Sequence, residues 1–253
     1  KFISDFIKNE GLNALVINTA TGPAPSYNYD ISREEIAESY GTPWEEMEPK
    51  SKGEKIDYMK DAVAAYVVKL YEEGKIDGII SVGGLQNTVM AANAMQKLPI
   101  GVPKLMVSTM ASGDVERYVG TSDILMMPSI VDVAGINKIS KIIFKNAVLT
   151  IAGMVAGQEK LAEEETIEEK PLIAASMFGV TTPCVEQAKA VLEQAGYEVL
   201  VFHATGTGGK TMESLINQGF FKGVLDLTTT EWCDQIAGGV LSAGEHRCEA
   251  AVK

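Results

Sequence analysis

Residues 76–88 read Ile-Asp-Gly-Ile-Ile-Ser-Val-Gly-Gly-Leu-Gln-Asn-Thr, a largely apolar run that ends in two glycines and leads into a helix-like pattern. We predict a strand over Ile76–Val82 and a helix over Gln86–Lys97. A strand that passes through a glycine turn directly into a helix is half of a β-α-β unit. The stretch therefore favours an α/β fold.

Strands and helices alternate along the rest of the first half. A helix over residues 56–70 carries its apolar side chains on one face. Further strands are expected at Lys104–Ser108 and Ile124–Val131, followed by a helix that begins near Gly135. An earlier apolar run, Leu12–Thr19, predicts one more strand after a short helix. Because the strands read as continuous apolar runs, both faces of the sheet should be covered, which is typical of parallel sheets.

An acidic segment, Glu159–Pro171 with the sequence EKLAEEETIEEKP, separates the two halves. Such charge runs are usually solvated linkers, so we expect a first domain over residues 1–165 and a second over residues 166–253. No strand is expected before the first helix or after the last one, so we interpret the chain as a fragment whose second domain is truncated. In the second half we expect strands at Leu172–Met177, Glu198–His203 and Gly223–Leu227. The helices between and after them are expected at Pro183–Ala195, Lys210–Gln218 and Glu231–Ala243.

The composition excludes several classes of protein. Lys and Arg total 22 against 34 Asp and Glu, a net charge of −12, which makes nucleic acid an unlikely partner. The nearly uncharged run Asn146–Gly157 is shorter than the roughly 20 residues that cross a bilayer, and the start lacks the features of a secretory signal. Three cysteines at no zinc-ligand spacing favour reduced thiols. We therefore expect a soluble cytoplasmic protein without a membrane partner.

The turns that follow the predicted strands are rich in glycine and hydroxyl side chains. Ligands of doubly wound sheets bind outside the carboxyl ends of the strands. Glycine lets backbone N–H groups approach an anion, and the helix that follows adds the positive end of its dipole. The candidate phosphate contacts are Ser81, Gly83, Gly84, Thr88, Ser112, Gly113, Thr205, Gly206, Thr207, Gly208, Gly209, Lys210, Thr211 and Thr229.

Residues 204–211 fit a relaxed phosphate-loop pattern in which Ala204 replaces the first glycine and Gly209-Lys210-Thr211 are intact. Three interpretations stay open: a phosphate-loop nucleoside triphosphatase, a glycine loop that touches phosphate without that mechanism, and a tight connection that needs glycine for steric reasons alone. Under the first two, Gly208→Val should block phosphate while leaving the fold intact.

A metal site is a further expectation. Asp226, Glu231 and Asp123 lie near the same turns and are candidate ligands of Mg²⁺, although acidic residues at such places also cap helices. No arranged nucleophile and base can be recognised, so no catalytic residue is assigned and enzymatic activity stays open.

Several longer stretches carry a family resemblance. The runs Leu98–Thr109, Gly120–Asp123, Val131–Asn137 and Thr228–Trp232, together with the loop Thr205–Gly209, resemble a largely uncharacterised microbial family similar to the amino-terminal, ATP-binding half of the tomato tobamovirus-resistance protein. The similarity extends over nearly the whole chain, from about Asp30 to Ala251. It implies two Rossmann-like α/β domains, a site for ATP and assembly into oligomers, expected to be dimers.

The resemblance implies no known reaction. The plant relative acts by binding a viral replication protein, so a binding role has as much support from kinship as an enzymatic one. We therefore predict a nucleotide-binding protein that holds ATP, with Mg²⁺ as an accompanying ion, at the strand carboxyl ends. The alternatives are a metal-dependent enzyme that transfers phosphoryl or nucleotidyl groups and a non-catalytic module that binds or inhibits a protein partner.

Overall fold

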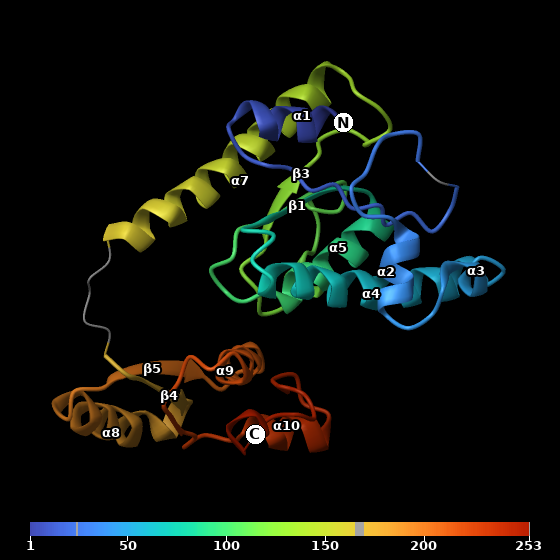
Figure 1. Ribbon diagram of the computed structural model, residues 1–253. Coiled ribbons are helices and arrows are strands. Elements are labelled where there is room, and N and C mark those ends of the chain that lie inside the picture. Colours follow the sequence, from blue (N-terminus) through green and yellow to red (C-terminus); the bar gives the residue numbers. More distant parts are fainter. Residues whose placement is uncertain (24, 165–169, 253) are drawn as a thin grey trace. The chain divides into compact units, whose positions relative to one another are not determined.

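The computed structural model describes residues 1–23, 25–164 and 170–252 (Figure 1). The chain divides into two compact units, Lys1–Glu165 and Thr166–Lys253. Each unit contains one three-stranded parallel sheet flanked by helices. The predicted α/β class with parallel sheets is confirmed.

The sheet of the first unit consists of β1 (Ile79–Gly83), β2 (Lys104–Ser108) and β3 (Leu125–Pro128), with β2 in the centre. Every residue of β2 is buried, as its continuous apolar run predicted. The register aligns Gly83 with Ser108 and Ser108 with Pro128. All three strands therefore end at one edge of the sheet.

Helices cover both faces of this sheet. Helix α4 (Lys52–Glu72) packs on α5 (Leu85–Lys97), and Met106 of β2 packs against α5. On the opposite face, Leu105 and Val107 pack against α7 (Lys138–Glu164). The other helices of the unit are α1 (Phe2–Asn9), α2 (Arg33–Ser39), α3 (Trp44–Met47) and α6 (Glu116–Val119). Sequence analysis did not predict α2, α3 and α6, because helices of four to seven residues are too short to show a clear apolar period.

The strand predicted at Leu12–Thr19 is wrong as a regular strand. Only Ile17 forms a bridge, to Ile31. The backbone of Val16 instead pairs with Asp30, whose N–H donates to the Val16 carbonyl at 2.8 Å and whose carboxylate accepts from the Val16 N–H at 2.7 Å. The backbone hydrogen bonds of Val16 and Asn18 thus go to Asp30 and Ile31 and not to a strand of the sheet.

The second unit has the strand order β5-β4-β6, with β4 (Leu172–Met177) in the centre between β5 (Glu198–His203) and β6 (Gly223–Leu225). Its helices are α8 (Thr182–Gln194), α9 (Thr207–Asn217) and α10 (Glu231–Ala237), with short 3₁₀ turns η1 (Gly179–Thr181) and η2 (Ala250–Val252). Ile173, Ala175, Val185 and Val199 form its core.

Two helices of this unit differ from the sequence prediction. Helix α9 begins at Thr207, three residues before the predicted Lys210, so part of the glycine loop is the first turn of the helix. Helix α10 ends at Ala237, well before the predicted Ala243, because Gly238 takes a left-handed conformation that stops it.

Helix α7 continues to Glu164, so the first part of the predicted acidic linker is helical, while residues 165–169 lie outside the described residues. Among the described residues, one segment, Lys138–Gln158 of α7, is long and apolar enough to cross a membrane, with a mean hydropathy of 1.5. Phe144, Ala147 and Ile151 of this helix pack in the core against the sheet. Other apolar side chains of the same segment, Ile139, Ile142 and Leu149, are exposed.

Candidate functional site

The turn between β1 and α5 presents open backbone donors in the first unit. Gly84 is the N-cap of α5 and supplies no side chain to cap the helix. The first-turn N–H groups of Leu85, Gln86 and Asn87 precede the intrahelical ladder and have no hydrogen-bond partner within the described residues. The N-terminus of α5 therefore presents the positive end of the helix dipole and several free N–H groups at the carboxyl edge of the sheet.

Two of the predicted hydroxyl ligands, Thr88 and Ser81, form hydrogen bonds that support this turn. The fully buried Thr88 hydroxyl donates to the Gly84 carbonyl at 2.8 Å and lies 2.6 Å from the buried Ser108 hydroxyl. The Ser81 hydroxyl accepts from the Asn87 side-chain amide at 3.0 Å. Gly83 is needed here, because a Cβ at this position would lie 2.5 Å from Cβ of Asn87.

Other hydroxyl groups are exposed at the same edge. Thr109, which follows β2, donates its backbone N–H to the Gly83 carbonyl at 3.3 Å, and its hydroxyl is the atom nearest to a Cβ built on Gly84, at 3.7 Å. Ser112 and Gly113 are exposed farther along the same loop. Sequence analysis did not select Thr109 as a candidate contact. Its proximity to Gly84 depends on the pairing of β1 with β2.

A second loop reaches the first turn of α5. The Gln86 side chain donates to the Thr21 hydroxyl at 3.0 Å. The buried Arg33 holds this loop by donating to the carbonyls of Ala20, at 3.0 Å, and Gly22, and its guanidinium stacks 4.3 Å from the centre of the Trp44 ring. Sequence reasoning missed this loop because the contact joins residues 65 positions apart.

The glycine loop of the second unit already binds an anionic group of its own chain. The N–H groups of Gly206 and Gly209 donate to Oε1 of Glu231 at 2.7 and 3.1 Å. Oε2 of Glu231 accepts from Nε of Arg247 at 2.7 Å, and both side chains are fully buried. The loop therefore forms an anion-binding nest at the N-terminus of α9, and a carboxylate fills it.

The remaining residues of this loop have different surroundings. A Cβ at Gly208 would lie 1.8 Å from the His203 carbonyl oxygen, so glycine is required there by the backbone alone. The expectation that Gly208→Val leaves the fold intact is therefore wrong. The Thr211 hydroxyl donates to the Thr207 carbonyl at 2.9 Å, and the Thr205 hydroxyl to the His203 carbonyl at 3.4 Å. Lys210 and, in the turn before α10, Thr229 are exposed.

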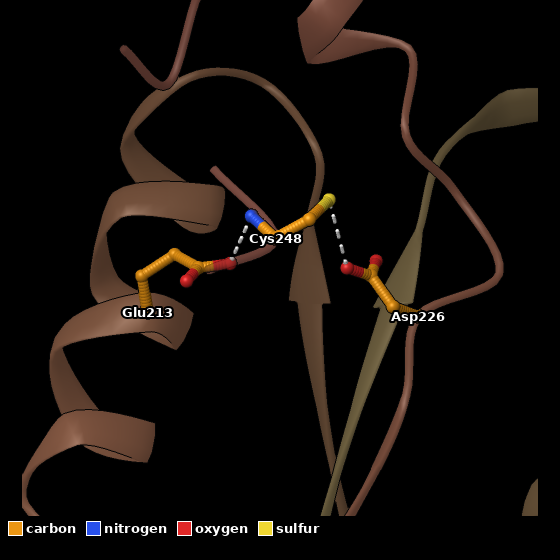
Figure 2. A group of neighbouring side chains, drawn as sticks. All are labelled: Glu213, Asp226 and Cys248. Carbon is orange, nitrogen blue, oxygen red and sulfur yellow. Dashed lines mark hydrogen bonds between the residues drawn. The ribbon is translucent and has the colours of Figure 1, made fainter. Parts of the chain in front are cut away.

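An acidic group in the second unit surrounds Arg247. Figure 2 shows Glu213, Asp226 and Cys248, whose potential metal-ligand atoms lie within 4.8 Å of one another. Nη1 of Arg247 lies 3.0 Å from Glu213, 2.5 Å from Asp226 and 3.3 Å from the Cys248 sulfur. The guanidinium thus provides the positive charge that a metal ion would otherwise bring to these three side chains.

The Arg247 guanidinium also changes the proton affinity of its neighbours. Burial by itself would raise the pKa of Asp226, but hydrogen bonds from Arg247 and Ser176 and the charge of Arg247 hold it below its ordinary value. Burial likewise opposes the charged form of Arg247, yet its carboxylate partners raise the pKa of the guanidinium. Sequence analysis did not identify Arg247 or Glu213, because no local pattern distinguishes a buried charge from an exposed one.

The three candidate metal ligands are paired with basic side chains of their own units. Asp226 and Glu231 pair with Arg247. Asp123 accepts from the buried Lys104 at 2.5 Å and from the Gly101 N–H at 2.8 Å. Burial opposes ionisation of Asp123, but Lys104 and the Gly101 N–H hold its pKa below the ordinary value. These side chains already balance buried positive charges, so their arrangement does not favour a Mg²⁺ site.

Comparison with known proteins identifies relatives along the whole chain. A UPF0261 protein of Clostridium tetani is 49% identical over 252 residues, which cover 99% of this chain and 61% of the relative. A UPF0261 protein of Rhizobium meliloti is 41% identical over 255 residues, which cover 100% of this chain and 61% of the relative. The ToMV resistance protein Tm-1(GCR237) of Solanum lycopersicum is 44% identical over 203 residues, which cover 80% of this chain and 27% of that protein.

The chain therefore spans less than two thirds of the length of these curated relatives. Two family models also match it. The N-terminal domain of the uncharacterised protein family UPF0261 matches residues 1–160, and the C-terminal domain of the same family matches residues 170–253. The resemblance noted in the sequence is confirmed, and the chain belongs to the UPF0261 family.

Proposed function

We propose that this chain is a nucleotide-binding protein that holds the phosphate groups of ATP at the turn between β1 and α5. The observation that carries the proposal is the uncapped N-terminus of α5, whose first N–H groups have no partner within the described residues. A helix N-terminus at the carboxyl edge of a parallel sheet is a favourable place for an anion. The neighbouring hydroxyl of Thr109 adds a donor beside Gly84.

The contrast between the two units supports this choice of turn. In the second unit, the N–H groups of Gly206 and Gly209 already donate to Glu231. In the first unit, no acidic side chain accepts a hydrogen bond from the equivalent turn within the described residues. In this proposal the N–H groups of Leu85 and Gln86 and the hydroxyls of Thr109 and Ser112 contact phosphate, while Ser81 and Thr88 support the turn.

A binding role has more support than an enzymatic one. Asp123, Asp226 and Glu231, the candidate metal ligands, each pair with Lys104 or Arg247. We therefore propose that Mg²⁺ arrives with ATP and keeps its own water ligands. The two units are proposed to be Rossmann-like domains of a cytoplasmic, oligomeric protein. The alternative, transfer of a phosphoryl or nucleotidyl group, requires a product, which chromatography of ATP after long incubation with the protein would detect.

Calorimetric titration of the full chain with MgATP tests the proposal, with Gly84→Ala as the informative variant. The backbone of Gly84 is in an extended conformation and the added methyl would make only an ordinary contact with Thr109, so the fold should tolerate it. The methyl enters the space beside the free N–H groups and should weaken binding by about tenfold or more, which corresponds to about 1.4 kcal/mol. Gly53→Ala, in the first turn of α4 with no atom within 4 Å, is the matched control.

Absence of binding heat at millimolar MgATP would remove the proposal. Equal affinity of Gly84→Ala and Gly53→Ala would retain nucleotide binding but move it away from this turn. Adenosine, which lacks phosphate, should bind far more weakly than ATP if the turn recognises phosphate.

A further inference from the structure

Helix α10 contacts the rest of the second unit through the Glu231 carboxylate and through Trp232, whose indole N–H donates to the Arg247 carbonyl at 3.0 Å. Of its seven residues, Glu231 is the buried one, and Ile236 on the same helix is 82% exposed. Gly238 ends the helix in a left-handed conformation and is followed directly by Gly239. A short helix with little apolar contact and a glycine pair at its end can leave its position without disrupting a core.

The hydrogen-bond donors that bind the Glu231 carboxylate are held in place by other residues. Three donors converge on its two oxygens: the N–H groups of Gly206 and Gly209 and Nε of Arg247. Arg247 is held independently by Asp226 and by Glu213, so it remains in place when Glu231 leaves. The site therefore combines two oriented backbone donors with a fully buried guanidinium.

An external phosphate group would find additional donors at this site. The first-turn N–H groups of Thr207 and Gly208 have no hydrogen-bond partner within the described residues, and the exposed Lys210 makes no ion pair among them. A carboxylate offers two oxygens, whereas a phosphate offers at least three and carries more charge. The receptor therefore has unused donors that a phosphate can reach and Glu231 does not.

We propose that the Gly206–Gly209 loop and Arg247 form a second anion receptor, that Glu231 occupies it as an internal ligand, and that a phosphate group displaces Glu231 and releases α10. This inference goes beyond the proposed function, since it concerns another unit and other residues. Because Glu231 is tethered, it competes at a high effective concentration. The intact protein should therefore bind free phosphate weakly, and removal of the carboxylate should strengthen binding.

The test is a titration of the full chain with inorganic phosphate and with AMP, followed by tryptophan fluorescence, in which Trp44 is common to all the proteins compared and Trp232 lies beside the receptor. The indole N–H of Trp232 donates to the Arg247 carbonyl, so this tryptophan reports on the receptor. Gly84→Ala is present in every protein and weakens the first-unit turn equally in each, so differences in affinity between the proteins arise in the second unit. Glu231→Ala should bind phosphate at least tenfold more tightly than the parent protein, which carries Gly84→Ala alone. Asp234→Asn removes a carboxylate from the same helix without touching the loop and should bind like the parent.

Equal affinity of Glu231→Ala and Asp234→Asn for phosphate would overturn the inference. Equal affinity for inorganic phosphate and AMP would identify the phosphate group as sufficient, and tighter binding of AMP would identify a phosphate monoester as the ligand. Circular dichroism establishes whether Glu231→Ala is folded.

A measurement on the chain without substitutions decides the matter if Glu231→Ala does not fold. Hydrogen exchange over residues 231–237 is followed with and without about 10 mM pyrophosphate, a concentration in the range of a tethered competitor. Release of α10 predicts faster exchange there and unchanged exchange in α8. Unchanged exchange in α10 would overturn the inference.

Discussion

Nε of Arg247 lies 2.7 Å from Oε2 of Glu231, and neither side chain has any exposed area. The same guanidinium reaches Asp226 and Glu213, so side chains from α9, from α10 and from the segments that follow β6 and α10 meet in one charged cluster. Buried ions are stable only when they are paired and their hydrogen bonds are satisfied. Arg247 therefore links the carboxyl edge of the second sheet to the segments that follow it.

Arg247→Met should destabilise the second unit strongly. The substitution leaves three carboxylates close together without their common partner, and loss of one member of a buried pair costs about 3–5 kcal/mol. Urea unfolding followed by circular dichroism measures the change. Lys189→Met, which removes an exposed pair with Glu193, is the control and should change the free energy of unfolding by less than about 1 kcal/mol. A similar small change for both variants would contradict the structural role of Arg247.

The stability of the second unit should fall at acid pH through Asp226. Its pKa in the folded state lies below the ordinary value of 3.8, so the carboxylate contributes its full stability well above pH 3.8. That contribution is lost as the pH falls through 3.8 toward the folded-state pKa, because the unfolded chain binds the proton more readily. Asp226→Asn should be less stable than the parent at neutral pH and should show a flatter dependence between about pH 5 and pH 2. Parallel pH profiles for the two proteins would exclude this role.

Gly208→Ala should destabilise the fold of the second unit in the absence of any ligand. A Cβ at this position would lie 1.8 Å from the His203 carbonyl oxygen, which is backbone and cannot rotate away. We expect a loss of about 1–3 kcal/mol in the free energy of unfolding, typical of overpacking. Thermal denaturation compares it with Gly53→Ala, where no atom lies within 4 Å. Unchanged stability would mean that the loop adopts another conformation.

Thr88→Val and Thr109→Val should separate support from ligand contact in the first unit. Thr88 is buried between Gly84 and Ser108, so its replacement should cost about 1–3 kcal/mol of stability. Thr109 is exposed, so Thr109→Val should leave stability nearly unchanged and lower the affinity for MgATP. Urea unfolding and calorimetry on both variants provide the comparison. If Thr88→Val instead lowered the affinity without loss of stability, and Thr109→Val left the affinity unchanged, Thr88 would be the ligand contact and Thr109 would have no part in binding.

Much of the fold follows from local patterns. The strands Lys104–Ser108, Leu172–Met177 and Glu198–His203 were predicted with the observed bounds, because a continuous apolar run in a covered sheet leaves few alternatives. The run Leu12–Thr19 has the same apolar character but forms one bridge, since its backbone pairs with the nearby Asp30 and Ile31. An apolar run thus indicates an extended segment, whereas membership of a sheet depends on an available partner strand.

The amino-acid sequence alone determined the α/β class, the parallel strands and the glycine turns at their carboxyl ends, because these depend on residues adjacent in the chain. Tertiary structure alone decided which turn stays open to a ligand. The Gly206–Gly209 loop and the turn after β1 look alike as sequence, but Glu231 and Arg247 lie 22 and 38 residues beyond Gly209 and meet it only in the folded unit. Whether a backbone N–H group is free depends on which distant side chain folding brings to it, and no local pattern specifies that.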